Sequence, residues 1–184
     1  APFTVDLLLP SGAENLNYVL YTDESPYKMQ REWLDRLPFD IYSVNVHTGA
    51  KRLIGRSYRT APKWSVNGKW AVMYDPIAQV WNKFDGATGK VVNISDAIGY
   101  PMFMESYDKP APAPAYGIAG WTADGNNVFL YDAYDWWKID LTGERQPECL
   151  TKGYGRKHGK SIRKMTSNID KDVFQKDEKV IVSL

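Results

Sequence analysis

The sequence has a single cysteine, Cys149, among its 184 residues. One cysteine excludes an intramolecular disulfide framework, and it leaves the redox compartment open because exported proteins need not contain disulfides. Histidine is almost as scarce, with only His47 and His158. Because no paired histidine and cysteine spacing exists, we expect no zinc site and no cofactor.

Excess charge and long apolar runs are also missing. The formal net charge is +1, which gives no electrostatic reason to expect a nucleic acid or an anionic membrane as partner. No apolar run approaches the ~18 residues that span a bilayer, so we expect no membrane span. The chain begins with Ala1-Pro2-Phe3 and not with Met. We therefore expect either a mature form whose signal peptide has been removed or an excised part of a longer protein.

A short internal repeat is the most informative feature present. Thr-Gly pairs begin at Thr48, Thr88 and Thr142, each just after a strand-like run. Separations of a few tens of residues are typical of four-stranded blades joined by hairpin turns. With 43% hydrophobic and 14% aromatic residues, the chain can also bury a core. The repeat predicts an all-β fold, a partial β-propeller of about three to four four-stranded antiparallel blades.

Two copies of the repeat are clear. In the first, the phrase of residues 64–70 (WSVNGKW) makes an Asn-Gly turn before the strand 70–74, and residues 80–84 pair back. In the second, residues 121–127 (WTADGNN) turn, residues 127–132 run out, and residues 136–140 return. The two phrases superpose, as do Tyr74-Asp75 and Tyr131-Asp132.

An earlier, degenerate copy is interrupted by an insertion at residues 24–40. Within it, the apolar residues Met29, Trp33, Leu34 and Leu37 fit a short amphipathic helix near residues 27–37, ended by Pro38. Residues 108–115 (DKPAPAPA) contain alternating Pro and Ala, which favours a stiff extended connector across the propeller face. We therefore expect one propeller fragment over 1–184: a degenerate blade at 1–60, a blade at 61–100, a connector at 101–115, a blade at 116–152, and part of a further blade at 153–184.

Three phrases carry a family resemblance: residues 115–125 (AYGIAGWTADG), 130–140 (LYDAYDWWKID) and 150–157 (LTKGYGRK). They resemble the propeller of Bacteroidetes-type prolyl oligopeptidase and dipeptidyl peptidase-like proteins, and residues 64–69 are similar to the TolB-type repeat. The resemblance covers roughly residues 40–165. It implies a propeller that caps an α/β-hydrolase domain carrying Ser, Asp and His, and that filters peptides entering its active site. It also implies a bacterial protein of the periplasm or the secreted fraction.

The hydrolase domain itself is missing from this chain. No Gly-x-Ser-x-Gly occurs, since the run from Gly55 through Ser57 to Arg59 lacks the second glycine of the strained nucleophile turn. We therefore expect no catalytic residue here. The partners expected are a peptide or protein substrate and the missing hydrolase domain or remaining blades. Because few blades leave open edge strands, an edge-strand dimer is expected as well.

Candidate substrate-binding residues lie in the insertion, where blade packing does not require them. They are Tyr27, Arg31, Glu32 and Trp33. Loops and insertions on rigid scaffolds carry recognition, so we expect this element to overhang a substrate chamber. The tryptophans inside the repeat are instead expected to fill the space between twisted blades.

Other patterns have structural interpretations that we favour. Asp132 and Asp135 form a carboxylate pair suited to acid/base work on a sugar, but Asp75 recurs at the position of Asp132, so turn capping is expected. The basic stretch 156–164 is expected to be a solvated loop rather than a phosphate grip. Residues 153–159 are expected to be a Gly-bent link between blades. The leading hypothesis is a noncatalytic gating or docking propeller of a serine peptidase-like protein. The rivals are a freestanding TolB-like interaction module and a carbohydrate-active propeller.

Overall fold

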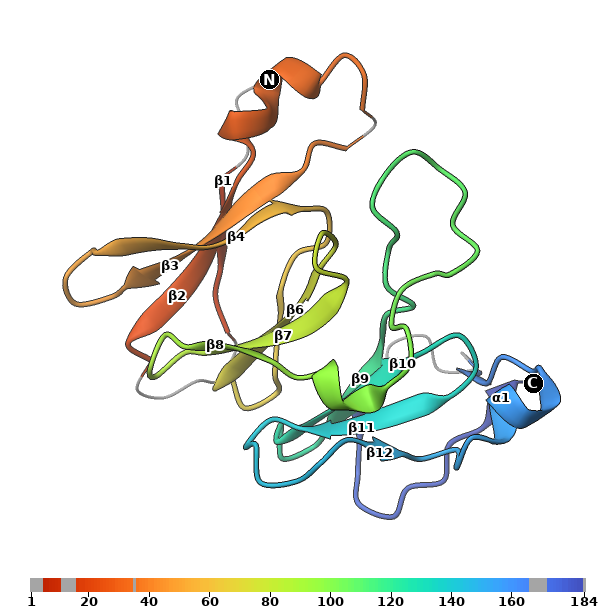
Figure 1. Ribbon diagram of the computed structural model, residues 1–184. Helices are drawn as coiled ribbons and strands as arrows, with labels where there is room; N and C mark the ends of the chain where they lie inside the picture. The colour runs from red at the N-terminus through yellow and green to blue at the C-terminus, as the bar shows by residue number, and fades with distance from the viewer. Residues whose placement is uncertain (1–4, 11–15, 35, 166–171, 184) are drawn as a thin grey trace.

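The computed structural model describes residues 5–10, 16–34, 36–165 and 172–183. Within these residues the strands form three antiparallel meanders of four strands, and a fifth strand joins the third sheet. Figure 1 shows the three sheets stacked one after another along the chain. The expected all-β fold is therefore confirmed, as an incomplete β-propeller.

The first sheet has the order β1-β2-β3-β4. Its strands alternate between two faces, since Leu20 pairs with Ser43 and Tyr21 pairs with Tyr42. Leu20 is completely buried, whereas the Tyr21 ring stacks on the Tyr42 ring on the other face. The strands are β1 (Val5–Leu8), β2 (Tyr18–Asp23), β3 (Phe39–Asn45) and β4 (Lys51–Tyr58), with the 3₁₀ helix η1 (Ser25–Gln30) between β2 and β3.

The second and third sheets repeat the same meander. The second contains β5 (Lys63–Trp64), β6 (Trp70–Asp75), β7 (Val80–Asp85) and β8 (Val91–Asn93), followed by the 3₁₀ helix η2 (Asp96–Ile98). The third contains β9 (Ile118–Thr122), β10 (Asn127–Tyr131), β11 (Trp136–Asp140) and β12 (Glu148–Cys149).

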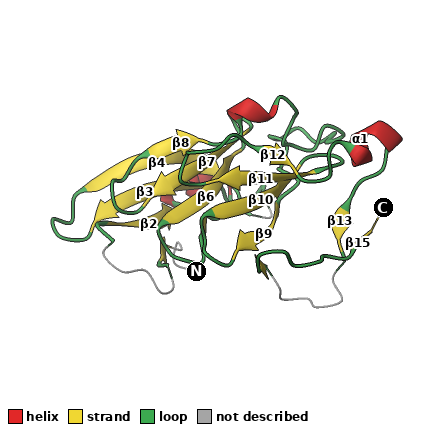
Figure 2. Ribbon diagram, turned by 90° about the horizontal axis from the view of Figure 1, so that it is seen from below, coloured by secondary structure: helices red, strands yellow, loops and turns green. Residues whose placement is uncertain are grey.

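The segment after β12 covers the far side of the third sheet. It contains the short helix α1 (Tyr154–His158) and the strands β13 (Arg163–Lys164), β14 (Val173–Phe174) and β15 (Val182–Ser183). Strand β14 adds to β9 in parallel, whereas β13 pairs with β15. Figure 2 shows β13 and β15 apart from the larger sheets. The boundaries of the blades along the chain stay a prediction.

Three buried clusters hold the sheets together. Leu20 and Ile41 of the first sheet pack with Phe84 of the second. Trp81 of the second sheet packs with Trp121 and Trp137 of the third, which confirms that these tryptophans fill the space between blades. A third cluster places Phe174 of β14 against the outer side of the third sheet. Because neighbouring residues of a strand point to opposite faces, each inner strand can serve two clusters at once.

The sequence repeat is explained by one shared set of hydrogen bonds. In the second sheet Trp70 N donates to Ser65 Oγ at 3.2 Å, and Lys69 N donates to Asn67 Oδ1 at 3.1 Å. In the third, Asn127 N donates to Thr122 Oγ1 and Asn126 N donates to Asp124 Oδ1. The hydrogen bond from Thr122, followed by that from Asn126, lowers the pKa of Asp124. The two copies also touch, because Asn67 Nδ2 donates to Asp124 O at 2.9 Å.

The meander gives each sheet two different ends. The first-to-second and third-to-fourth strand turns lie at one end, which we call the turn face, and it includes all three Thr-Gly turns. The second-to-third turns and the links between sheets lie at the other end, which we call the loop face. In Figure 1 the insertion and the loop between β8 and β9 project on the same side of the sheets.

Short turns capped by polar side chains close the turn face. Asn45 Oδ1 accepts from Thr48 N at 3.0 Å, and Asp85 Oδ1 accepts from Thr88 N at 3.2 Å. Asp140 Oδ1 accepts from Thr142 N at 2.9 Å in the third copy. This shared Asx capping explains why the Thr-Gly phrase follows an Asn or Asp each time.

Two elements of the loop face differ from expectation. The insertion is helical, but as the 3₁₀ helix Ser25–Gln30 and not as an amphipathic helix over 27–37, since η1 has no buried residue to form an apolar side. The Pro/Ala segment does not cross the propeller as an extended connector. Phe103 pairs with Ala115, and Met104 N donates to Pro114 O at 2.8 Å, so residues 104–114 form a loop that returns to its start.

Candidate functional site

The β10–β11 turn on the loop face contains the carboxylate pair that the sequence analysis singled out. Asp132 and Asp135 are 0% and 1% exposed. Asp132 Oδ1 accepts from Tyr134 N at 2.7 Å and from Asp135 N at 2.5 Å, which closes the turn. The corresponding Asp75 accepts from Ile77 N and Ala78 N in the same way. The prediction of turn capping is confirmed for Asp132 and Asp75, whereas the Asp135 side chain accepts from Thr151 and from the start of α1.

The second oxygen of Asp132 joins the turn to helix α1. It accepts from Trp137 Nε1 at 3.0 Å and from Arg156 Nη2 at 3.1 Å. The Arg156 guanidinium also lies 4.0 Å from the centroid of the Tyr100 ring. The hydrogen bond and charge of Asp132 raise the pKa of Arg156, even though burial acts in the opposite direction and is the largest influence. The ion pair therefore connects the β10–β11 turn with α1, and the Arg156 guanidinium adds a contact to the segment just after η2.

Asp135 anchors the start of α1 through its backbone. Its Oδ1 accepts from Thr151 Oγ1 at 2.6 Å and Gly155 N at 2.9 Å, and its Oδ2 accepts from Arg156 N at 3.0 Å. A side chain at position 155 has no room, because a Cβ there would lie 2.6 Å from Tyr134 O and 2.7 Å from Lys160 O. The Gly-bent link predicted for 153–159 thus contains a helix, α1, flanked by Gly153 and Gly159 in the left-handed region.

These hydrogen bonds decide against acid/base chemistry at the carboxylate pair. Both side chains are buried, and their oxygens already accept from backbone, indole, hydroxyl and guanidinium donors. A catalytic carboxylate must reach a substrate proton at hydrogen-bonding distance. Asp132 and Asp135 are therefore structural residues that hold the loop face in shape.

The four candidate binding residues lie on or just after η1, but they do not converge on one point. Tyr27 OH donates to the buried Asp40 Oδ1 at 2.5 Å, and the same oxygen accepts from Ser57 N. Burial, followed by the hydrogen bond to Asp40, raises the pKa of Tyr27. Tyr27 thereby attaches the insertion to β3 and β4. Ser57, in the run that lacks a nucleophile motif, is a backbone partner of this contact.

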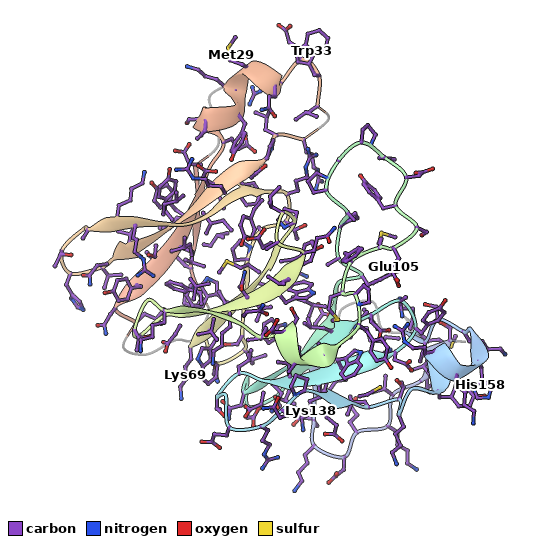
Figure 3. The ribbon with its side chains drawn as sticks, in the orientation of Figure 1. Met29, Trp33, Lys69, Glu105, Lys138 and His158 are labelled. Atoms are coloured by element: carbon purple, nitrogen blue, oxygen red, sulfur yellow. The ribbon has the colours of Figure 1, made fainter. Side chains whose placement is uncertain are left out.

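The other three candidates are exposed. Arg31 lies 4.0 Å from Glu24, and Glu32 is exposed. Trp33 is 82% exposed, as is Met29. Figure 3 shows both of these labelled side chains at the outer tip of the insertion, directed away from the sheets. A substrate-binding role for Tyr27, Arg31, Glu32 and Trp33 stays a prediction.

A cavity of about 470 Å³, which we call the insertion groove, lies between the insertion and the link from the first to the second sheet. Its charged lining consists of Glu24, Arg31, Arg36 and Arg59. Leu34, Leu37 and Phe39 supply its apolar lining. Sequence reasoning missed Arg36 and Arg59 because they lie more than twenty residues apart in different connections. No local spacing pattern joins them.

The basic stretch 156–164 is only partly solvated. Arg163 Nη2 donates to Asp132 O at 2.9 Å, and Lys164 Nζ lies 2.9 Å from Asp172 Oδ1. Together with Arg156, these side chains are held against protein groups, while Lys157 and Lys160 are exposed. The two histidines do not form a common site, because each contacts a different part of the chain. His158 Nδ1 contacts Tyr154 O, and His47 Nε2 contacts Asn17 Oδ1.

Among the residues placed by the structure, no cluster of three or more His, Cys, Asp and Glu side chains could hold a metal ion. No helix formed by those residues has the length and apolar character to cross a bilayer.

Fold and site together define a β-propeller fragment with short, side-chain-capped Thr-Gly turns on the turn face and longer connections on the loop face. No family model matches the sequence, and no curated protein matches it. Similar solved structures include the acylaminoacyl peptidase of Pyrococcus horikoshii, with 15% identity over 80% of this chain and a TM-score of 0.41. The β-propeller domain of the trilobed protease from Pyrococcus furiosus has 16% identity over 79% of this chain and a TM-score of 0.38.

TolB from Acinetobacter baumannii is a further similar structure, with 14% identity over 79% of this chain and a TM-score of 0.30. The chain spans only 24% of the length of the acylaminoacyl peptidase, 42% of the trilobed protease propeller and 43% of TolB. Likeness at these identities and TM-scores says nothing about the activity of this chain.

Proposed function

We propose that this chain is the noncatalytic propeller portion of a serine peptidase-like protein of the prolyl oligopeptidase type. Its loop face docks peptide and gates its access to a hydrolase domain that lies outside these residues. The remaining blades complete the propeller. Because the blade phrases resemble bacterial proteins of the periplasm or the secreted fraction, we also propose that the parent protein is bacterial and periplasmic or secreted.

The observation that carries this proposal is the difference between the two faces. The Thr-Gly turns of the turn face are short and closed by their own Asn or Asp side chains. The loop face instead has the insertion, the loop of residues 104–114 and α1, and it includes the insertion groove. Long connections on a rigid scaffold are where binding residues gather. The blade phrases that resemble the peptidase propellers supply the second support.

In this proposal the loop at residues 104–114 forms a rim of the entrance. Tyr74 OH of β6 donates to Ala113 O at 3.1 Å, which attaches the returning arm of the loop to the second sheet. The hydroxyl is a donor at neutral pH, as for any tyrosine, and burial, with a smaller contribution from the charge of Asp75, raises the pKa of Tyr74 further, to about 12. The outgoing arm exposes Met104 and Glu105.

The native gene tests the hydrolase part of the proposal. We expect the coding sequence after the codon for Leu184 to continue through further blade repeats into a segment of domain length. That segment should encode Gly-x-Ser-x-Gly followed by Asp and His in the order of α/β-hydrolases. A stop codon directly after Leu184 would contradict the proposal and favour a freestanding interaction module of TolB type.

A further inference from the structure

We propose that the insertion groove binds the C-terminal carboxylate of a peptide whose last side chain is apolar. This inference rests on the proposed peptide-docking function and specifies which end of the peptide the loop face recognises.

The charge of the groove points to an anionic group. Among the residues that the structure describes, three guanidinium groups line it against a single carboxylate, that of Glu24. In the described part of the chain, neither Arg36 nor Arg59 takes part in a hydrogen bond or an ion pair, and both are exposed. Each planar guanidinium offers donors in the fork geometry that matches a carboxylate. The two arginines therefore have donors available for a ligand.

The position of the arginines favours one ligand held from two sides. Arg36 belongs to the insertion, whereas Arg59 follows β4 in the link to the second sheet. The insertion is fixed relative to β4 because Asp40 accepts from both Tyr27 OH and Ser57 N. A pocket whose walls are fixed in this way loses less conformational entropy when it binds a ligand.

The apolar lining distinguishes a peptide end from a free inorganic anion. Leu37 is 8% exposed, and Leu34 and Phe39 are half-buried beside the arginines. Apolar surface next to paired cations suits a ligand that has a carboxylate and an apolar side chain on the same carbon atom. A C-terminal amino-acid residue has that arrangement. The volume, about 470 Å³, lies in the range of small-ligand sites and accommodates one or two residues.

The test compares a peptide acid with its amide on the full 184-residue chain. Acetyl-Ala-Ala-Phe with a free carboxylate and the same peptide with a C-terminal carboxamide are titrated by isothermal calorimetry. The amide keeps the phenyl group and the backbone and loses only the charge. Because hydrogen bonds to charged groups exceed those to neutral groups, we expect the acid to bind at least about tenfold more tightly.

Variants then assign the difference to the groove. The double variant Arg36→Gln/Arg59→Gln should weaken binding of the acid about tenfold, to the level of the amide, and leave binding of the amide unchanged. The matched control is Arg56→Gln, which removes an exposed arginine of β4 outside the groove and should leave both affinities unchanged. Thermal unfolding of all variants checks that the fold is intact.

Three results would overturn the inference. They are equal affinities of the acid and the amide for the unmodified chain, no binding of the acid, and displacement of the acid by an equal concentration of inorganic phosphate. Equal affinities would leave peptide docking by the loop face standing. Whether a hydrolase domain follows is tested separately, by the coding sequence. A negative answer there would not change the difference in affinity between the peptide acid and the peptide amide.

Discussion

Replacing Asp132 with alanine is expected to lower the free energy of unfolding by about 3 kcal/mol, because it removes the buried member of a partly exposed ion pair together with its other hydrogen bonds. Arg156 would keep its charge with its Nε already buried and without a hydrogen-bond partner in the described structure. The substitution also leaves Trp137 Nε1 and two turn amides without their acceptor. Urea denaturation followed by tryptophan fluorescence measures the change.

Asp75→Ala is the matched control for this substitution. Asp75 occupies the equivalent turn of the second sheet, where it accepts from the turn amides of Ile77 and Ala78 and its carboxylate meets the Tyr58 hydroxyl. It forms no ion pair with the residues that the structure describes. Loss of these contacts should lower the free energy of unfolding by about 1–2 kcal/mol. If both variants lose the same amount, the ion pair with Arg156 adds nothing, and its role in fixing α1 is wrong.

Phe84→Ala should destabilise the chain by about 3–5 kcal/mol, the range for deleting a large side chain from a packed core. Phe84 is 0% exposed, and it packs with Leu20 and Ile41 of the neighbouring sheet. Its ring also meets the Trp64 ring edge-to-face, at 6.1 Å between centroids. Because the first two sheets share this cluster, both should lose stability together. Chemical denaturation monitored by far-UV circular dichroism measures the change.

Ile77→Ala provides the surface comparison, since Ile77 lies in the turn between β6 and β7 of the same meander and is 65% exposed. Its effect should stay within about 0.5 kcal/mol. If Phe84→Ala is equally mild, the first and second sheets do not pack as neighbouring blades.

The blade strands could be predicted because their signals are local. The Asn67-Gly68 turn and the Thr-Gly turns capped by Asn or Asp mark where the hairpins bend. The alternation of apolar and polar residues indicates the strands between these turns. The same local logic predicted that Asp75 and Asp132 cap turns. The partners of Asp132 beyond the turn were not predictable, because Arg156 lies 24 residues away and only the folded chain brings it near.

The insertion shows where sequence periodicity misleads. Met29, Trp33 and Leu37 have helical spacing, yet Met29 and Trp33 are exposed, and only Leu37 is buried. An amphipathic helix requires a surface against which its apolar side packs. The insertion projects away from the sheet, and η1 has no buried residue. For the Pro/Ala stretch, composition predicted an extended backbone. It gave no sign of the Phe103 and Ala115 pairing that turns the chain back.

The candidate site was predictable as a region and not as a set of residues. Arg31 was singled out for lying outside the repeat, and it does line the insertion groove. Arg59 belongs to the groove through the bend after β4, which no spacing rule connects to Arg36. A binding site assembled from separate connections becomes visible only when the meander brings those connections to one face.

Hydrogen–deuterium exchange on the complete gene product, compared with residues 1–184 alone, tests most directly whether the loop face is the docking surface. We predict slower exchange in the complete protein at residues 24–34, 104–114 and 153–160, and unchanged exchange in the Thr-Gly turns at 45–50, 85–90 and 140–145. Protection confined to the Thr-Gly turns, or equal exchange at both faces, would contradict the account.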